Sequence, residues 1–481
     1  MDKRVKVLSN ISWRFAERAG ARAVSFIVTL VIARILSPSD YGVIAMVNVF
    51  IELADVIVAS GFGSAVIQKK DADELDYSSA FYFQLVLSAL TYIILFFSAP
   101  YIQRFYGKQY ILLSSVLRIL GLRLFLVALN SMQNAYVSKH MQYKKFFFAT
   151  LSGTIISAFL GIVSAYQGFG VWALVIQYLS NSIINTLVLW ITVEWHPVLK
   201  FSFYRLKQLY SYGWKLLATS LVDIGYQKLR DLLIGKIYSS ADLAFYNRGT
   251  SFPSLIVSNI NTSIDNVIFP VMSNEQDNIE KVKAMARRSI KTSSYIMFPM
   301  MMGMAVCAEP IIRLILTEKW LPAVPFLQIF CFVYAWQPIH TANLNAIKAL
   351  GCSGLYLKLG IWKDIIGIIA LIASIKYGVF WVAVSCGIAE IAASAINALP
   401  NKKLMNYSYF DQLRDLIPAT LLAVTMGVLV YAVNFIYLPD IFKLVIQIIL
   451  GIFSYTGLSY LFNIESFVYL KDILMRLVKK R

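Results

Sequence analysis

The sequence contains little charge and few of the residues from which enzymes build catalytic centres. Only 15% of its 481 residues are charged, whereas a soluble chain has about a quarter, and it holds just three histidines and four cysteines. His140, His196 and His340 lie far apart, and the cysteines are scattered through apolar segments without metal-ligand spacing. The P-loop pattern of ATPases is absent. We therefore expect buried free thiols, no cofactor, no metal and no enzymatic activity.

Long apolar runs take the place of the missing charge, since 58% of the residues are hydrophobic. Runs of about 20 residues recur throughout, and each can cross a hydrocarbon core of ~30 Å. The sequence thus predicts an all-α polytopic membrane protein with about fourteen transmembrane helices. The expected helices are 11–36, 41–66, 77–98, 111–134, 146–167, 171–192, 209–237, 241–271, 288–316, 322–349, 355–377, 379–399, 415–437 and 440–462.

The formal charge of +18 could indicate a nucleic-acid partner or membrane orientation. Lysines and arginines crowd into alternate loops, as the positive-inside rule requires of cytoplasmic loops. The opposite loops hold only Arg104, Lys108, Lys319 and Lys376, with Lys236 at a border. The charge therefore predicts a multi-pass membrane protein with both termini in the cytoplasm and no nucleic-acid partner.

One short pattern occurs twice. "IARILSPSDYG" aligns with "IGKIYSSADLA", which places Ser37 on Ser239 and Asp40 on Asp242. Serine and aspartate before an apolar run cap the N-terminus of the next helix. Each copy is therefore predicted to be a tight turn between two spanning helices.

Six predicted helices separate the two copies, so the repeated halves have the same orientation in the membrane. Parallel repeats of this kind occur in transporters whose substrate site lies between the halves. We predict an N-terminal lobe of helices 1–6 (1–208), a C-terminal lobe of helices 7–12 (209–407), and a segment (408–481) with helices 13–14 and a basic amphipathic tail.

Charged residues interrupt the apolar runs, above all in the first helix. Arg14, Arg18 and Arg22 share one helix face, and Arg22 lies roughly 15 Å from the cytoplasmic end. An unpaired arginine at mid-bilayer costs about 2.5–3.5 kcal/mol, so this face should meet water, protein or an anion. Guanidinium groups suit phosphate oxygens, which predicts a cationic cavity between the lobes. Further candidates for its lining are Lys215, Arg118, Arg123, Lys228 and Arg248.

The alternative for these cations is internal pairing. Arg18 could pair with Glu17 and Lys228 with Asp231, and Arg14 could reach the interface. Acidic residues in the apolar segments could in turn carry protons or bind a coupling cation, although structural pairing is the commoner use. The candidates for coupling are Glu17, Asp55, Asp223 and Glu390, and Glu52 and Asp364 have the same character.

Two further sequence features are interpreted as structural and not as catalytic. Asp71-Ala-Asp73 has the D-x-D form of sugar-nucleotide enzymes, but it stands in an acidic loop without an α/β domain around it, so we interpret it as a solvated loop. His340 is interpreted as a hydrogen-bonded core histidine.

Four stretches carry a resemblance to a known family: "ARILSPSDYGVIAMV", "SGFGSAVIQKKD", "GFGVWALVIQ" and "FYNRG…VIFPVMSNEQDN". They resemble Wzx-type polysaccharide exporters of the multidrug/oligosaccharidyl-lipid/polysaccharide superfamily, in the branch of colanic-acid and teichuronic-acid exporters. The resemblance implies a flippase of the bacterial plasma (inner) membrane for undecaprenyl-pyrophosphate-linked oligosaccharides, with two six-helix lobes around a V-shaped cavity. It also implies that arginines of the first helix, here Arg18 and Arg22, bind pyrophosphate.

The implied partners are a lipid-linked oligosaccharide, membrane lipids, and the polymerase and glycosyltransferases of the same pathway. Two other functions stay open at this point. A cation-coupled multidrug exporter of the same superfamily would favour an acidic cavity, which the first helix opposes. A membrane glycosyltransferase or ligase would need catalytic outer loops, and those predicted here are short.

Overall fold

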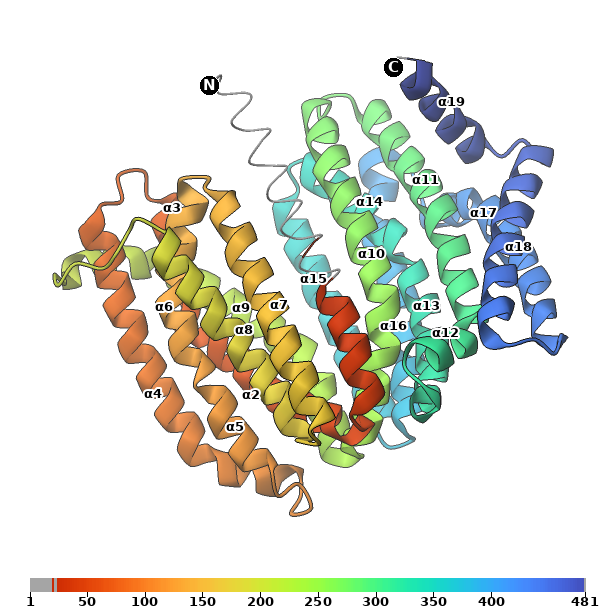
Figure 1. Ribbon diagram of the computed structural model, residues 1–481. Coiled ribbons are helices and arrows are strands. Elements are labelled where there is room, and N and C mark those ends of the chain that lie inside the picture. Colours follow the sequence, from red (N-terminus) through yellow and green to blue (C-terminus); the bar gives the residue numbers. More distant parts are fainter. Residues whose placement is uncertain (1–19, 21–23, 480–481) are drawn as a thin grey trace. The chain divides into compact units, whose positions relative to one another are not determined.

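The protein is α-helical throughout the part of the chain that the structure describes (Figure 1). This computed structural model describes residue 20 and residues 24–479, without the side chains of 262–267, 473–474 and 476–479. Contacts between residues divide the chain into two compact units, Met1–Ala244 and Phe245–Arg481. The predicted division at residues 208 and 407 stays a prediction.

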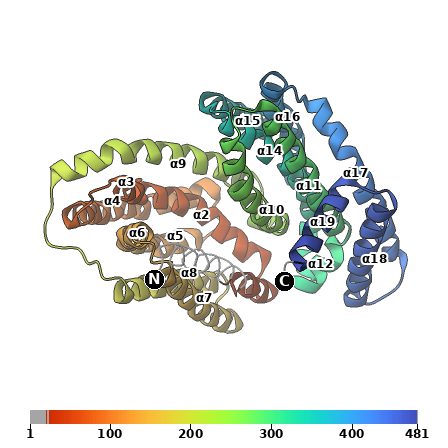
Figure 2. The same ribbon diagram turned by 90° about the horizontal axis from the view of Figure 1, so that it is seen from above.

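The first unit contains the helix Val24–Ile35 and eight that follow it. The long helix α9 lies along α2, α3 and α4 (Figure 2). The bounds are α2 (Pro38–Ala59), α3 (Phe62–Gln68), α4 (Glu74–Tyr106), α5 (Leu113–Gly121), α6 (Arg123–Lys139), α7 (Tyr143–Tyr166), α8 (Val171–Thr192) and α9 (Phe203–Ile237).

The helix α10 (Ser240–Asn274) begins in the first unit and continues into the second. In the second unit α11 packs against α13, α14 and α17. The remaining bounds are α11 (Ile279–Val306), α12 (Ala308–Ile315), η1 (Glu318–Ala323), α13 (Val324–Ala335), α14 (Gln337–Ala349), α15 (Ser353–Ser374), α16 (Val379–Met405), α17 (Tyr409–Ala432), η2 (Val433–Phe435), α18 (Asp440–Leu461) and α19 (Glu465–Lys479).

Each unit has its own buried core. In the first, Phe62 of α3 and Phe81 of α4 pack in one cluster with Trp195, which follows α8. In the second, Ile290 of α11 packs with Leu416 of α17. Burying a large apolar side chain contributes about 1.5–3 kcal/mol, so these clusters hold together helices that are distant in sequence.

Nine helical stretches among the described residues are long and apolar enough to cross a membrane, or ten if α11 and α12, bent by 68°, form one span. This confirms a multi-pass membrane protein. The helices α9, α10 and α15 occupy places where spanning helices were predicted, but they are not among these stretches. Charged residues recur along α9 and α15, and α10 is rich in amides and serines, which lowers their hydropathy. The count of fourteen therefore stays a prediction.

The two predicted turns form as expected. The Ser37 Oγ accepts a hydrogen bond from the Asp40 N–H at 3.2 Å and donates to the Asp40 carboxylate at 2.6 Å. Ser239 and Asp242 repeat this arrangement at 3.1 and 2.6 Å. Each pair is a capping box, which satisfies N–H groups that a helix start leaves free. The likeness of the two halves is thus real at these turns, while the arrangement of the full repeats stays a prediction.

The two turns also contact each other within the first unit. The hydroxyls of Ser39 and Ser240 are 2.9 Å apart, and the Ser240 N–H donates to the Tyr110 hydroxyl at 3.0 Å. Gly42 makes this approach possible, because a Cβ atom there would lie 1.8 Å from the Ser240 carbonyl oxygen. The contact joins the start of α2 to the start of α10.

We expect Gly42→Ala to destabilise the protein by roughly 1–3 kcal/mol, although alanine favours helices. The new methyl group would push apart two backbone segments, neither of which is a flexible side-chain end. Gly225→Ala in α9 is the matched control, because its Cβ would have no neighbour within 4 Å. Thermal unfolding of the detergent-purified protein measures both variants. Equal unfolding temperatures for the two would refute the close contact.

Candidate functional site

A cluster of charged side chains joins three helices of the first unit. Glu52 and Asp55 lie one turn apart on α2, Arg123 begins α6, and Lys228 and Asp231 lie one turn apart on α9. Arg123 Nη2 is 3.2 Å from Asp55 Oδ2, and Lys228 Nζ is 2.9 Å from Glu52 Oε1 and 3.7 Å from Asp231 Oδ2. We call these five residues the charge cluster. It is a set of ion pairs that joins the apolar helices α2 and α6, where charged groups are retained only with partners, to the more polar α9.

The acids and cations of the charge cluster differ in burial. The Asp55 and Asp231 side chains are 17% and 15% exposed, whereas those of Arg123, Glu52 and Lys228 are 35%, 34% and 21% exposed. One oxygen of Asp55, Oδ1, is buried and accepts no hydrogen bond from the described residues. The cations are therefore more accessible than two of their three acids.

The sequence left two interpretations open for Arg123 and Lys228, a shared anion site and internal ion pairing. The two residues lie in one cluster, as a shared site requires, and each also has an acidic partner. The predicted Lys228–Asp231 pair is present, but Glu52 is nearer to the ammonium group. Glu52, which the sequence did not link to Lys228, is therefore the nearer of its two acidic partners.

The other predicted cations lie elsewhere. Arg118 of α5 donates to the Phe96 carbonyl oxygen at 3.1 Å, and its guanidinium carbon is 4.3 Å from the Phe96 ring centre. Arg248 of α10 lies 5.4 Å from the ring centre of Trp320. Lys215 of α9 is exposed, and the described part of the chain offers its side chain no partner. Among the contacts of the described residues, neither Arg118 nor Lys215 reaches the charge cluster, and Arg248 belongs to the second unit.

The first-helix candidates Arg14, Glu17, Arg18 and Arg22 fall outside the described residues, and their roles stay predictions. Asp223 of α9 is exposed, without a side-chain partner among the residues that the structure describes.

Glu390 of α16 lies in a polar network of the second unit. Its Oε1 accepts a hydrogen bond from the Gln337 amide at 2.8 Å and is 3.1 Å from Nε2 of His340. The other ring nitrogen of His340 is 2.8 Å from the Asn397 amide nitrogen. His340 is thus a buried, hydrogen-bonded core residue, as interpreted. The sequence did not predict Gln337 and Asn397 as members of this network, because a single Gln or Asn in an apolar helix forms no recognisable sequence pattern.

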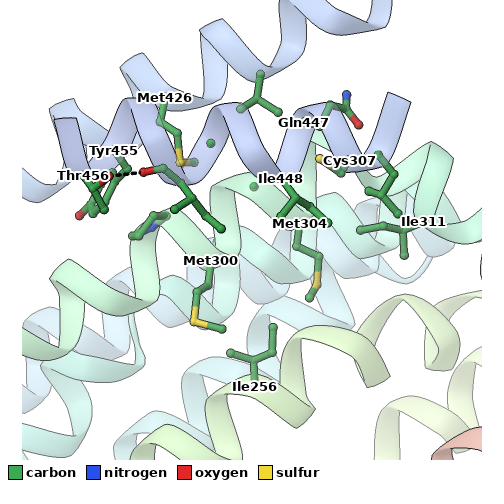
Figure 3. A pocket seen from close by; sticks show the side chains of 16 residues that line it. Ile256, Met300, Met304, Cys307, Ile311, Met426, Gln447, Ile448, Tyr455 and Thr456 are labelled. Carbon is green, nitrogen blue, oxygen red and sulfur yellow. Dashed lines mark hydrogen bonds between the residues drawn. The ribbon is translucent and has the colours of Figure 1, made fainter. Parts of the chain in front are cut away.

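The second unit also contains a large apolar pocket beside α11 (Figure 3). Its volume is about 580 Å³, within the range of ligand pockets. Two polar side chains of its wall donate elsewhere, Gln447 to Asn434 Oδ1 at 2.9 Å and Tyr455 to the Tyr295 carbonyl at 2.8 Å. Gln447 Oε1 is buried and accepts no hydrogen bond from the described residues. The rest of the wall is mostly hydrocarbon and thioether, with the Cys307 thiol and with the Thr456 hydroxyl, which donates to the Ile452 carbonyl at 2.6 Å. It is formed largely by Ile256, Met300, Met304, Met426, Ile448 and Ile452.

Asp73, the second acid of the D-x-D motif, caps α4 and does not project into a site. Its Oδ1 accepts the Asp76 N–H at 3.0 Å, and its Oδ2 is 3.1 Å from Arg205. Burial raises the pKa of Asp73, but the Asp76 hydrogen bonds and the Arg205 charge outweigh burial, so the pKa lies below its ordinary value.

The fold is that of a known class of membrane transporters. The chain matches a solved structure of the lipid II flippase MurJ in an inward closed conformation with a TM-score of 0.75 and 16% identity, over 93% of this chain and 98% of that one. An inward-facing MATE multidrug transporter of the MOP superfamily matches with a TM-score of 0.59 and 14% identity, over 83% and 96% of the chains.

The sequence identifies the family within this class. Residues 31–325 match the model of the family described as polysaccharide biosynthesis protein, and the chain belongs to that family. It is 24% identical to the teichuronic acid biosynthesis protein TuaB of Bacillus subtilis over 79% of both chains. It is 21% identical to the lipopolysaccharide biosynthesis protein WzxC of Escherichia coli over 77% of this chain and 76% of that one. These matches confirm the resemblance to Wzx-type exporters.

Proposed function

We propose that the protein flips an oligosaccharide linked through pyrophosphate to a polyprenyl lipid, for polysaccharide biosynthesis and export. Such a substrate is an amphiphile with an anionic linkage and a long apolar chain. The observation that carries the proposal is that one chain holds accessible cations in the charge cluster of its first unit and a large apolar pocket in its second unit. The family and its relatives support the same substrate class.

The pyrophosphate would be bound by the accessible cations of the charge cluster. Arg123 offers forked donors for phosphate oxygens and Lys228 a point charge. Arg14, Arg18 and Arg22 of the first helix are proposed as further ligands. Arg118 packs on Phe96, Lys215 is exposed, and Arg248 belongs to the second unit, so these three are the weaker candidates.

The lipid chain would lie in the apolar pocket of the second unit. A methyl-branched polyprenyl chain fits a wall of methionine and isoleucine, because flexible thioether side chains adapt to irregular shapes. Its transfer from lipid to this pocket costs little, since neither environment offers hydrogen bonds. The pocket would hold the chain in place while the polar end crosses.

The transport cycle is proposed to be alternating access between two like-oriented six-helix lobes around a V-shaped cavity, in the bacterial plasma membrane with both termini cytoplasmic. Binding energy from the anion would favour one lobe arrangement over the other. Glu390 with His340, Asp55, Asp223 and Glu17 are the proposed coupling residues. Polymerase and glycosyltransferases of the pathway are the proposed partners.

A multidrug exporter is the second candidate. Its support is the fold shared with MATE transporters, and a likeness at 14% identity concerns the fold alone. The named relatives act in polysaccharide biosynthesis, and one of them is the succinoglycan biosynthesis transport protein ExoT of Rhizobium meliloti. The flippase proposal therefore accounts for more of the observations.

Deleting the gene in its host cell tests the proposed function. We expect surface polysaccharide to fall and the lipid-linked oligosaccharide to accumulate, because synthesis continues on the cytoplasmic face without export. Normal surface polysaccharide in the deletion strain, together with greater drug sensitivity, would favour the drug exporter.

A further inference from the structure

We infer that an anionic phospholipid of the surrounding membrane binds to the second unit, with one acyl chain in an apolar groove and its phosphate on Arg414. This groove is distinct from the apolar pocket proposed for the substrate's chain. The lipid site goes beyond the proposed function, because binding of the lipid can be measured without transport.

The groove lies between α11, α13 and α17 and has a volume of about 530 Å³. All three helices belong to stretches that can cross a membrane, when α11 is counted with α12. Phe298 and Met302 of α11 line the groove, whereas Met300 lines the apolar pocket, so the two cavities lie on opposite faces of α11. We call this second cavity the open groove, and its main lining residues are Met301, Met302, Phe332, Trp336, Ile417 and Leu421.

The open groove is accessible from outside and offers few polar groups. The Ile417 and Leu421 side chains at its edge are 51% and 62% exposed. The Thr420 hydroxyl donates to a carbonyl of its own helix at 2.9 Å, and the Gln328 amide donates to a carbonyl of α11 at 3.2 Å. Apart from these groups and the Cys331 thiol, the wall is mostly hydrocarbon, thioether and aromatic ring. A hydrocarbon chain can therefore enter it without breaking hydrogen bonds.

The length of the open groove matches one acyl chain. On α17 it extends from Leu413 to Val424, which is ~16 Å at 1.5 Å per residue. Half of a hydrocarbon core of ~30 Å has nearly the same length, so a chain from one leaflet fills the groove from end to end. The polyprenyl chain of the proposed substrate is much longer. A partner's membrane helix would favour small residues over this wall of methionines and aromatic rings. A phospholipid is thus the occupant that fits.

An exposed cation lies at one end of the open groove. Arg414 has no acidic partner among the described residues, and it precedes Ile417 by one turn on the same face of α17. Because helical side chains point toward the N-terminus, its guanidinium group is directed at the polar end of the helix. The exposed Lys402 and Lys403 end α16 shortly before α17 begins. A guanidinium group suits phosphate oxygens, so this end of the groove favours a phospholipid with a net negative charge.

The two acids at this end of α17 are offset by cations of α11. Asp415 accepts hydrogen bonds from Arg287 through both of its oxygens, each at 2.7 Å. Asp411 is within electrostatic reach of Lys283 and Arg287. The positive charge of Arg414 is therefore left for a lipid phosphate.

Native mass spectrometry of the purified full-length protein tests the phosphate site. The probes are phosphatidylglycerol, which is anionic, and phosphatidylcholine with the same acyl chains, which is zwitterionic. We expect the wild-type protein to bind phosphatidylglycerol more tightly, and Arg414→Gln to reduce this preference about fivefold, the contribution of one cation at a membrane surface. Lys200→Gln is the matched control, because it removes an exposed cation from a loop that the positive-inside rule places on the same side. It should keep the wild-type preference.

A second pair of variants tests the groove itself. Thr420→Phe places a ring in the open groove, so it should weaken binding of both phospholipids about tenfold through lost contact with methylene groups. Thr425→Phe is the control. Thr425 is exposed on the same helix and donates to a backbone carbonyl at the same distance of 2.9 Å, but it does not line the groove. Its variant should bind both lipids as the wild-type protein does.

The contrary results are equally specific. An unchanged preference in Arg414→Gln overturns the phosphate site, and equal binding by Thr420→Phe and Thr425→Phe overturns the groove. Displacement of phosphatidylglycerol by undecaprenyl pyrophosphate would assign the groove to the substrate instead, and a dimer that only Thr420→Phe dissociates would assign it to a second copy of the chain. If Thr420→Phe fails to fold, Val424→Phe fills the groove from the same helix. Loss of the lipid site leaves the flippase proposal standing.

Discussion

Replacing Arg123 by glutamine is expected to lower transport of a pyrophosphate-linked lipid by about tenfold to a hundredfold. The reason is the loss of a charge-assisted hydrogen bond to phosphate, which contributes about 1.5–3 kcal/mol. The substitution also leaves Asp55 without its cation, and this alone would destabilise the helix packing. Flipping by the purified variant in liposomes, with thermal unfolding measured in parallel, checks the expectation.

A double variant separates substrate binding from structure. Arg123→Gln with Asp55→Asn removes the pair as a unit, so no uncompensated charge is left in the apolar helices and the unfolding temperature should recover. Transport should stay low, because the donor to phosphate is still missing. Recovery of both stability and transport in the double variant would show that Arg123 serves only to neutralise Asp55.

Filling the apolar pocket is expected to have the second largest effect. Gly303 of α11 lines the pocket, and a Cβ atom there would meet only Met426 Cε, at 3.9 Å. Gly303→Phe should therefore place its ring in the pocket with little strain. We expect transport of the full-length lipid to fall about tenfold, because losing contact with two or more methylene groups costs ~0.8 kcal/mol for each.

Gly457→Phe is the matched control for this variant. Gly457 lies in the neighbouring α18 but has no neighbour within 4 Å of its Cβ position and does not line the pocket. It adds the same ring to the same unit, so its transport should be near that of the wild-type protein. A short-chain substrate, measured in both variants, should be affected less than the full-length lipid. Equal activity of the two variants on the full-length lipid would exclude the pocket as the binding place of the chain.

Hydropathy and turn chemistry were sufficient to predict much of the fold. Apolar length placed the helices, and the Ser37–Asp40 and Ser239–Asp242 capping boxes formed where serine and aspartate precede an apolar run. These features are local, because they depend on residues three or four positions apart. Whether the polar helices α9 and α10 span the membrane was harder to predict. Hydropathy does not distinguish a spanning helix with a polar face from a helix outside the membrane.

The candidate site could be predicted only in part, because it depends on which helix faces meet. The Lys228–Asp231 pair was predictable from its spacing of three residues on one helix. The nearer partner, Glu52, is on a different helix and far away in sequence, so no local pattern connects it to Lys228. The apolar pocket was not predicted at all. Methionine and isoleucine look the same in a sequence whether they face a core, lipid or an empty pocket.

The most direct test of the account is flipping by the purified protein in sealed liposomes. Two fluorescent lipids would be compared, with the same polyprenyl chain and the same oligosaccharide, one joined through pyrophosphate and the other through an uncharged ether. The account predicts protein-dependent flipping of the pyrophosphate-linked lipid and little of the ether-linked one, because only the first carries the anion that the cations bind. Equal flipping of the two lipids would contradict it.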